Sequence, residues 1–212
     1  MSLRLCSESG SGIFVSVDGP SGAGKTTIVH HLAQLLVAQG EHVYVTVEPS
    51  AGPIGKLCHE LTETVSGHAL ACLYAADRYH HLVTEIRPYL AAGDVVISDR
   101  YVVVQRFDDI APDFLWQLNE DVDRPDLTVI LDADPDVISE RLCKRGPHNR
   151  FQLMSGSSHT EVAYYREAAK RLVDAGFEVL RVDCGERPPE QTAASIRDRL
   201  LPLLATSKAV RS

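Results

Sequence analysis

The sequence of 212 residues contains little that suggests a membrane, a disulfide framework or a metal cluster. Its five cysteines are an odd number and follow no metal-ligand spacing, which argues against a zinc site and for a reducing compartment. Apolar runs long enough to cross a bilayer are absent, and the first residues contain no apolar signal core. We therefore expect a cytoplasmic protein with no membrane partner.

Positive charge is also scarce, with 21 lysines and arginines against 29 acidic residues and a formal net charge of −8. This balance argues against a nucleic-acid polymer as partner, because binding a phosphate backbone requires a concentrated basic surface. No internal repeat is visible, and 44% hydrophobic residues suffice for one full core at this length. We expect a single domain over residues 1–212, with the short, Ser/Gly-rich residues 1–12 disordered.

The most informative stretch is residues 19–26, a glycine followed by four free positions and Gly-Lys-Thr. It lies between an apolar run that predicts a buried strand and a helical repeat of leucines. Glycines in this setting let backbone N–H groups surround an anion at a helix N-terminus. The motif predicts binding of a nucleoside triphosphate, with Lys25 at the β- and γ-phosphates and the Thr26 hydroxyl on Mg²⁺. The residues expected to bind it are Gly19, Ser21, Gly22, Ala23, Gly24, Lys25, Thr26 and Thr27.

Apolar β-branched runs alternate with helical patterns along the whole chain, which predicts a parallel sheet with helices on both faces. The expected strands cover residues 13–17, 42–47, 95–98, 127–133 and 177–183. The expected helices cover residues 26–39, 67–92, a short stretch between 106 and 124, 136–144, 161–175 and 189–204, before a tail at 205–212. The fold class is thus α/β, the three-layer P-loop fold with a five-stranded parallel sheet.

Acidic residues follow two of these strands directly. Glu48 ends the strand at 42–47, and Asp99 closes the strand at 95–98 beside Arg100. Because ligands bind beyond the carboxyl ends of parallel strands, both acids are expected on the rim that carries the phosphate loop. Asp99 is a candidate for holding Mg²⁺, directly or through water, and Arg100 for contacting phosphates. A simple surface ion pair between Asp99 and Arg100 is the alternative.

Tyr74 and Arg78 lie four residues apart on the long expected helix, so the ring and the guanidinium share one face. This pair is able to stack on a planar base and hydrogen-bond its edge. The alternative is an ordinary amphipathic helix, with the tyrosine in the core and the arginine in solvent.

Three cations, Lys144, Arg145 and Arg150, lie at the edge of a Gly/Ser/His-rich stretch at residues 146–160. An acidic protein that gathers positive charge at one loop indicates a lid, residues 144–160, that closes over phosphates. A solvated surface loop is the alternative.

Several short motifs give the chain a resemblance to the thymidylate kinase family, within the wider group of nucleoside and nucleotide kinases. They are Asp18-Gly19 with the phosphate loop, Glu48-Pro49, Leu-Tyr-Ala-Ala-Asp-Arg at 73–78, Ser-Asp-Arg-Tyr at 98–101, Arg-Pro-Asp-Leu-Thr at 124–128, Leu-Asp-Ala-Asp-Pro at 131–135 and Arg150-Phe151. The resemblance covers nearly the whole chain, about residues 13–204. It implies ATP- and Mg²⁺-dependent phosphorylation of a nucleoside 5′-monophosphate, dTMP to dTDP above all, by a homodimeric enzyme of nucleotide biosynthesis.

The resemblance also assigns roles to residues. It implies that Asp18 lies near the acceptor phosphate and magnesium, that Tyr74 stacks on the base and that Arg78 hydrogen-bonds it. Arg100 would clamp the acceptor phosphate, and Gln105 stands in the stretch that helps to hold the sugar. The phosphate loop contains no arginine, so Arg145 and Arg150 of the lid would supply the cation over the transferring group.

Departures from the family pattern concentrate on the acceptor side. Val47 stands where the family usually has an arginine, residues 102–106 replace a small, Ser-rich stretch, and the segment up to Arg124 is short. A second hypothesis therefore keeps the chemistry but places it on a hydroxyl of a nucleoside or another small metabolite, with Glu48 as general base. A third hypothesis is a nucleotide-binding regulatory module with weak hydrolysis. The pair of Tyr74 and Arg78 and the basic lid argue against it, because a regulatory module would not need them.

Overall fold

A computed structural model describes residues 12–102, 110–145 and 157–211 of the protein. Five parallel strands form one sheet in the order β2-β3-β1-β4-β5. The strands are β1 (Ile13–Asp18), β2 (Val43–Val47), β3 (Val95–Asp99), β4 (Leu127–Asp132) and β5 (Val179–Asp183). Val17 of β1 and Val47 of β2 both pair with Asp99, so three strands end level at one rim of the sheet. This confirms the predicted fold class.

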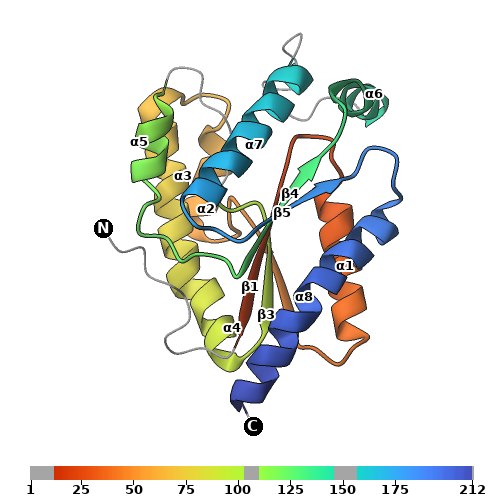
Figure 1. Ribbon diagram of the computed structural model, residues 1–212. Helices are drawn as coiled ribbons and strands as arrows, with labels where there is room; N and C mark the ends of the chain where they lie inside the picture. The colour runs from red at the N-terminus through yellow and green to blue at the C-terminus, as the bar shows by residue number, and fades with distance from the viewer. Residues whose placement is uncertain (1–11, 103–109, 146–156, 212) are drawn as a thin grey trace.

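Helices cover both faces of the sheet (Figure 1). On one face lie α1 (Lys25–Val37) and α8 (Pro189–Arg211), side by side, while α6 (Pro135–Arg145) follows β4. The other face carries α2 (Pro53–Leu61), α3 (Gly67–His81), α4 (Arg87–Ala92), α5 (Pro112–Gln117) and α7 (Ser157–Asp174).

Alternate residues of the central strand β1 serve the two faces, as the pleat requires. Val15 and Val17 belong to the core cluster under α1 and α8, whereas Phe14 packs with residues of α4 and β3 on the opposite face. Asp18 shares the strand face of Phe14 and is fully buried. The sheet thus directs Asp18 towards the side covered by α3 and α7.

The helix predicted at residues 67–92 is continuous, but its hydrogen-bonding pattern changes in the middle. A π-helical turn, Leu82–Ile86, separates α3 from α4. Such turns insert one residue and re-aim the side chains around them. Periodicity in the sequence does not reveal this feature, because Leu82 and Ile86 are both apolar and buried, as in an ordinary helix.

Several predicted boundaries are wrong. The final helix does not stop at residue 204 but continues to Arg211, because Leu200 and Leu204 are buried with α1 residues and the Lys208 ammonium pairs with Glu41 at 2.5 Å. The helix α2 was not predicted at all. Residues 157–160 form the first turn of α7, so the expected lid is helical at its end. Gly12, expected in the disordered segment, donates its N–H to Leu90 O at 3.1 Å.

Some predictions fall on residues that the structure does not describe. These are the disorder of residues 1–11, the acceptor contact of Gln105, the role of Arg150 and most of the lid at 146–156. In the described part of the chain, none of the helices combines the length and the apolar character that a membrane crossing needs.

Candidate active site

The phosphate loop joins β1 to α1 and curls back on itself. Gly22 and Gly24 have φ angles of 84° and 86°, a region that favours glycine over residues with a Cβ. Lys25 is buried, and its Nζ donates to the carbonyls of Gly19 at 2.7 Å and Pro20 at 2.9 Å. The pKa of Lys25 is lowered from its ordinary 10.5 to about 8, mainly because the ammonium is buried and to a smaller extent because the positive charge of Arg100 is nearby. The ammonium is thus held inside the loop, where the sequence predicts the β- and γ-phosphates.

The two predicted metal ligands meet at this rim. Thr26 Oγ1 donates to Asp99 Oδ2 at 2.6 Å. Asp99 Oδ1 is buried and accepts no hydrogen bond from the described residues, with Arg100 Nη1 3.8 Å away. A hydroxyl and a carboxylate are the oxygen ligands that Mg²⁺ prefers. The described residues contain no group of three or more His, Cys, Asp or Glu side chains that could hold a metal.

Asp18 lies at the end of β1, between the phosphate loop and Tyr101. Its Oδ1 accepts the Tyr101 N–H at 3.1 Å, while its Oδ2 is buried without a hydrogen-bond partner among the described residues. Burial raises the pKa of Asp18 from its ordinary 3.8 to about 7, against the opposing effects of Tyr101 N–H, Lys25 and Arg78. A buried carboxylate with an unsatisfied oxygen marks a place that a ligand is able to complete.

The Asp18→Asn variant should change how the stability of the ligand-free protein depends on pH. Because the pKa is raised to about 7 in the folded state, the contribution of Asp18 is fully present below about pH 4 and is lost as the pH rises through 7. Asparagine does not titrate, so the free energy of unfolding of the variant should rise relative to that of wild type between pH 4 and 7. Above about pH 8 the difference between the two proteins should no longer change with pH. Urea unfolding across this range measures the difference, and a difference independent of pH would contradict the assignment.

Glu48 and Arg78 form a buried ion pair at the same rim. Arg78 Nε donates to Glu48 Oε2 at 2.8 Å, Nη2 lies 2.8 Å from the same oxygen, and His81 Nδ1 lies 3.3 Å from Oε1. Glu48 and Arg78 are only 3% and 2% exposed. The alternative of a solvated arginine is therefore wrong. Glu48, expected as a rim carboxylate, already has both oxygens engaged.

The loop after β2 is fixed to α3 by a second acid. Asp77 accepts the Ser50 backbone N–H at 2.7 Å and the Ser50 hydroxyl at 2.6 Å. Since Asp77 and Arg78 are neighbours on α3, one helix turn holds both ends of the short segment at 48–50. This is how the fold places Glu48 with little freedom.

Asn119, just beyond α5, is a site residue that the sequence analysis missed. Its Oδ1 accepts a hydrogen bond from Arg78 Nη1, and its Nδ2 donates to Leu115 O at 2.7 Å. No local motif marks Asn119, because only the fold brings it to Arg78. Arg78 therefore contacts Glu48 on one side and Asn119 on the other, and its guanidinium carbon lies 5.7 Å from the Tyr101 ring centroid.

A pocket of about 210 Å³ opens on the α1 side of the phosphate loop. Besides the loop itself, Arg141 of α6 and Cys184, Arg187 and Pro189 after β5 line it. Arg141 Nη2 donates to the carbonyls of Cys184 at 3.0 Å and Gly185 at 2.7 Å, which ties the loop after β5 to α6. The sequence analysis did not predict these residues, which come from two distant segments.

Comparison with known proteins decides the family. Residues 17–196 match the model of the family described as thymidylate kinase. The chain belongs to the thymidylate kinase family. It is 35% identical over 192 residues to a probable thymidylate kinase of Pyrobaculum aerophilum, covering 87% of this chain and 94% of the relative. It is 36% identical over 211 residues to a thymidylate kinase of Geobacillus thermodenitrificans, with 90% and 92% covered, and 35% identical over 210 residues to one of Clavibacter michiganensis, with 92% and 97% covered.

Membership of the thymidylate kinase family confirms the resemblance drawn from the motifs and makes the protein a kinase.

Arg100, directly after β3, has a φ angle of 76°, a strained value for a residue with a side chain. Its N–H bonds Val17 O at 3.0 Å, and its carbonyl accepts the Ser98 hydroxyl at 2.6 Å, which hold the strained turn in place. The Arg100 side chain is 45% exposed at the rim, beside Asp99. It lies where the motif analysis expects a phosphate contact.

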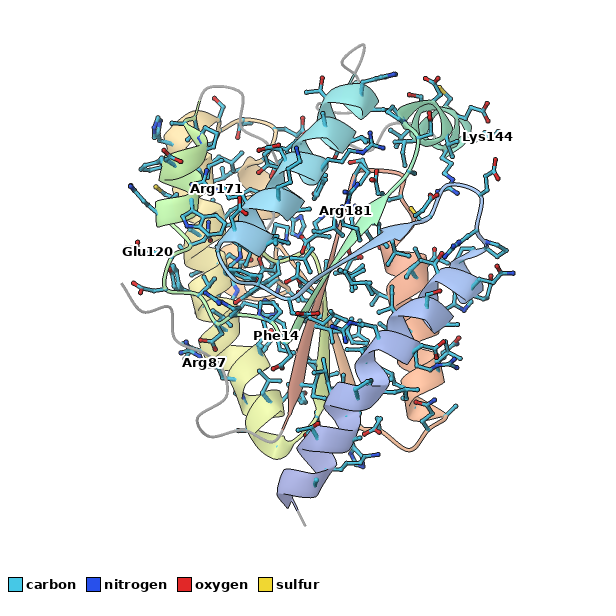
Figure 2. The ribbon with its side chains drawn as sticks, viewed as in Figure 1. Phe14, Arg87, Glu120, Lys144, Arg171 and Arg181 are labelled. Carbon is cyan, nitrogen blue, oxygen red and sulfur yellow. The ribbon has the colours of Figure 1, made fainter. Side chains whose placement is uncertain are left out.

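Tyr74 of α3 and two of the expected lid cations, Lys144 and Arg145, lie within the described residues. The Tyr74 hydroxyl shares a hydrogen bond with Thr62 at 3.0 Å, and the ring packs beside Leu70 in a small cluster, which partly matches the alternative of a core tyrosine. Lys144 is exposed on α6 at the edge of the molecule and pairs with Glu140 at 3.5 Å (Figure 2). Arg145 is the last residue of α6.

Proposed function

We propose that this member of the thymidylate kinase family transfers the γ-phosphoryl group of ATP to the phosphate of dTMP, giving dTDP and ADP. The relatives named thymidylate kinase supply the candidate acceptor. The observation that carries the choice over a hydroxyl acceptor is the state of Glu48, whose two oxygens are bound by Arg78 and His81. A general base needs an accessible carboxylate, whereas a phosphate acceptor is already ionised and needs none.

The roles of the residues follow from charge and position. Lys25, Arg100 and the lid residues Arg145 and Arg150 would neutralise the charge on the transferring group, which is the main source of catalysis in such reactions. Thr26 and Asp99 would hold Mg²⁺, which would supply positive charge to offset that of the phosphates. The oxygen donor set of this pair fits that ion.

Binding of the acceptor would use Asp18, Tyr74, Arg78, Arg100 and Gln105. Arg78 has five N–H donors, and its contacts with Glu48 and Asn119 use three, which leaves two for the edge of a base. The pocket beside Arg141 and Arg187 would take the ATP base, because it opens next to the glycines expected around the phosphates. A lid at residues 144–160 would exclude water from the transfer.

The cellular setting is part of the same proposal. We place the enzyme in the cytoplasm, in agreement with the free state of the four described cysteines, and as a homodimer, as its family resemblance implies. Light scattering coupled to size-exclusion chromatography tests the assembly.

A panel of acceptors tests the function. With ATP and Mg²⁺, kcat/KM is measured for dTMP, dUMP, dCMP, dAMP, dGMP and thymidine. We expect dTMP to exceed the other monophosphates by about tenfold or more, because a base edge that leaves buried donors unpaired is strongly disfavoured. Preference for thymidine would favour the hydroxyl acceptor. ATP hydrolysis that no acceptor stimulates would favour a regulatory module.

A further inference from the structure

We propose that His81 is a positioning residue for the acceptor: it fixes the carboxylate of Glu48, and through it Arg78, from the side opposite the acceptor. This inference rests on the proposed function, since it assumes that Glu48 and Arg78 face the bound nucleotide. His81 lies outside the sequence motifs named above. The structure places it at the last residue of α3 with no exposed surface at all.

Both nitrogens of the His81 ring have partners. Nδ1 lies 3.3 Å from Glu48 Oε1, and Nε2 lies 2.7 Å from Thr46 Oγ1 and 3.5 Å from Glu85 Oε2. An ionised carboxylate only accepts hydrogen bonds, so Nδ1 carries the hydrogen directed at Glu48. Nε2 and the Thr46 hydroxyl share a second hydrogen bond, and the same hydroxyl donates to Glu85 Oε2 at 3.5 Å. Partners on both sides fix the plane of the ring.

Arg78 and His81 divide the Glu48 carboxylate between them. Arg78 holds Oε2 through Nε and Nη2, and His81 holds Oε1. The two residues are three positions apart on α3, so they project from neighbouring turns of one helix face. Without His81, the carboxylate would be held at one oxygen only and would be able to rotate about its last bond. The guanidinium of Arg78, which shares this contact, would lose its fixed orientation as well.

The π-helical turn explains how the support behind His81 is built. It starts at Leu82, directly after His81, and contains Glu85. Glu85 Oε2 accepts the Tyr44 hydroxyl at 2.7 Å, and the Tyr44 ring stacks on Tyr89 with centroids 3.6 Å apart. A connected set of contacts thus runs from the edge strand β2 through Glu85, His81 and Glu48 to Arg78. π-Turns inside α-helices are often found at functional sites, and this one begins next to His81, which contacts Glu48.

Two replacements of His81 distinguish the contribution of Nδ1 from that of Nε2. His81→Asn keeps an N–H donor close to the position of Nδ1, which bonds Glu48, whereas His81→Gln places its amide near the position of Nε2. His68→Gln removes an exposed histidine from the first turn of the same helix and serves as the matched control. For each protein, the KM of dTMP, the KM of ATP, kcat and the melting temperature are measured. Acceptor dissociation constants come from the fluorescence of Trp116, the single tryptophan, which lies near Asn119.

We expect His81→Gln to raise the KM and the dissociation constant of dTMP by about 10- to 100-fold, the effect of losing one hydrogen bond to a charged group. The KM of ATP should stay unchanged, and His81→Asn should recover most of the loss. The less buried Glu85→Gln should raise the KM of dTMP by a smaller factor, and it tests the same support if the His81 variants do not fold. The inference is overturned if Asn and Gln have equal effects, if the KM of ATP rises as much as that of dTMP, or if only the melting temperature falls. If wild type prefers another monophosphate, the proposed function fails, and the same measurements on that acceptor still decide the role of His81.

Discussion

Replacing Lys25 with methionine is expected to lower kcat by about 10³-fold or more, while the protein stays folded. Methionine keeps an unbranched apolar side chain of nearly the same length but removes the ammonium, and with it the charge that would lie at the β- and γ-phosphates. The ammonium already sits inside the phosphate loop on the Gly19 and Pro20 carbonyls, so its position does not depend on a later rearrangement of the backbone.

The stability of this variant should differ little from that of wild type. Lys25 has a folded-state pKa of about 8, below its ordinary 10.5, so its protonated form disfavours folding at neutral pH. Removing that cost offsets the loss of two hydrogen bonds, and we expect the melting temperature to shift by less than about 4 °C. Lys170→Met, at an exposed lysine of α7, is the control for removing one positive charge. A folded Lys25→Met protein with near-normal turnover would rule out the phosphate-loop mechanism.

The Glu48→Gln variant should raise the KM of the acceptor by about 10- to 100-fold and lower kcat only modestly. In the structure Glu48 contacts Arg78 and His81, and under the proposed function it takes no proton, so its loss should weaken acceptor binding more than the chemical step. The variant also leaves Arg78 buried beside a neutral amide, and a fall in melting temperature should accompany the kinetic change.

A hydroxyl acceptor predicts the opposite pattern. Its proton must leave as the new bond forms, and a positioned base contributes about 10²- to 10⁴-fold to kcat. Steady-state kinetics of wild type and Glu48→Gln on the best acceptor distinguish the two. A kcat loss beyond about 10²-fold with KM nearly unchanged would contradict the monophosphate acceptor and support Glu48 as general base.

The parts of the site that follow directly from the sequence are those with a local cause. The phosphate loop, Thr26 and Asp99 are read from spacing and from strand ends, because parallel strands bring their carboxyl ends to one rim. The contact between Thr26 and Asp99 at 2.6 Å agrees with that expectation, although 73 positions separate the two residues. The sheet itself was predictable because the three central strands, β1, β3 and β4, are short runs rich in apolar residues and almost fully buried.

The parts that were missed depend on tertiary contacts. Asn119 joins the site only because α5 packs beside α3, and Arg141 reaches the loop after β5 only because α6 lies next to it. The engagement of Glu48 by His81 depends on the end of α3 and the π-turn, neither of which leaves a periodic signal. The predicted end of α8 came too early for the same reason, because its last turns are stabilised by packing on α1 and by the ion pair of Lys208 with Glu41.

The central claim is that the acceptor atom is a phosphate oxygen of dTMP. The most direct measurement offers the wild-type enzyme equal concentrations of dTMP and thymidine with Mg²⁺ and ATP labelled with ³²P at the γ-position, and separates the products by chromatography. Transfer to a phosphate oxygen predicts label in dTDP and none in dTMP. Label in dTMP, which forms only if the thymidine hydroxyl is phosphorylated, or label in inorganic phosphate alone would contradict the proposed function.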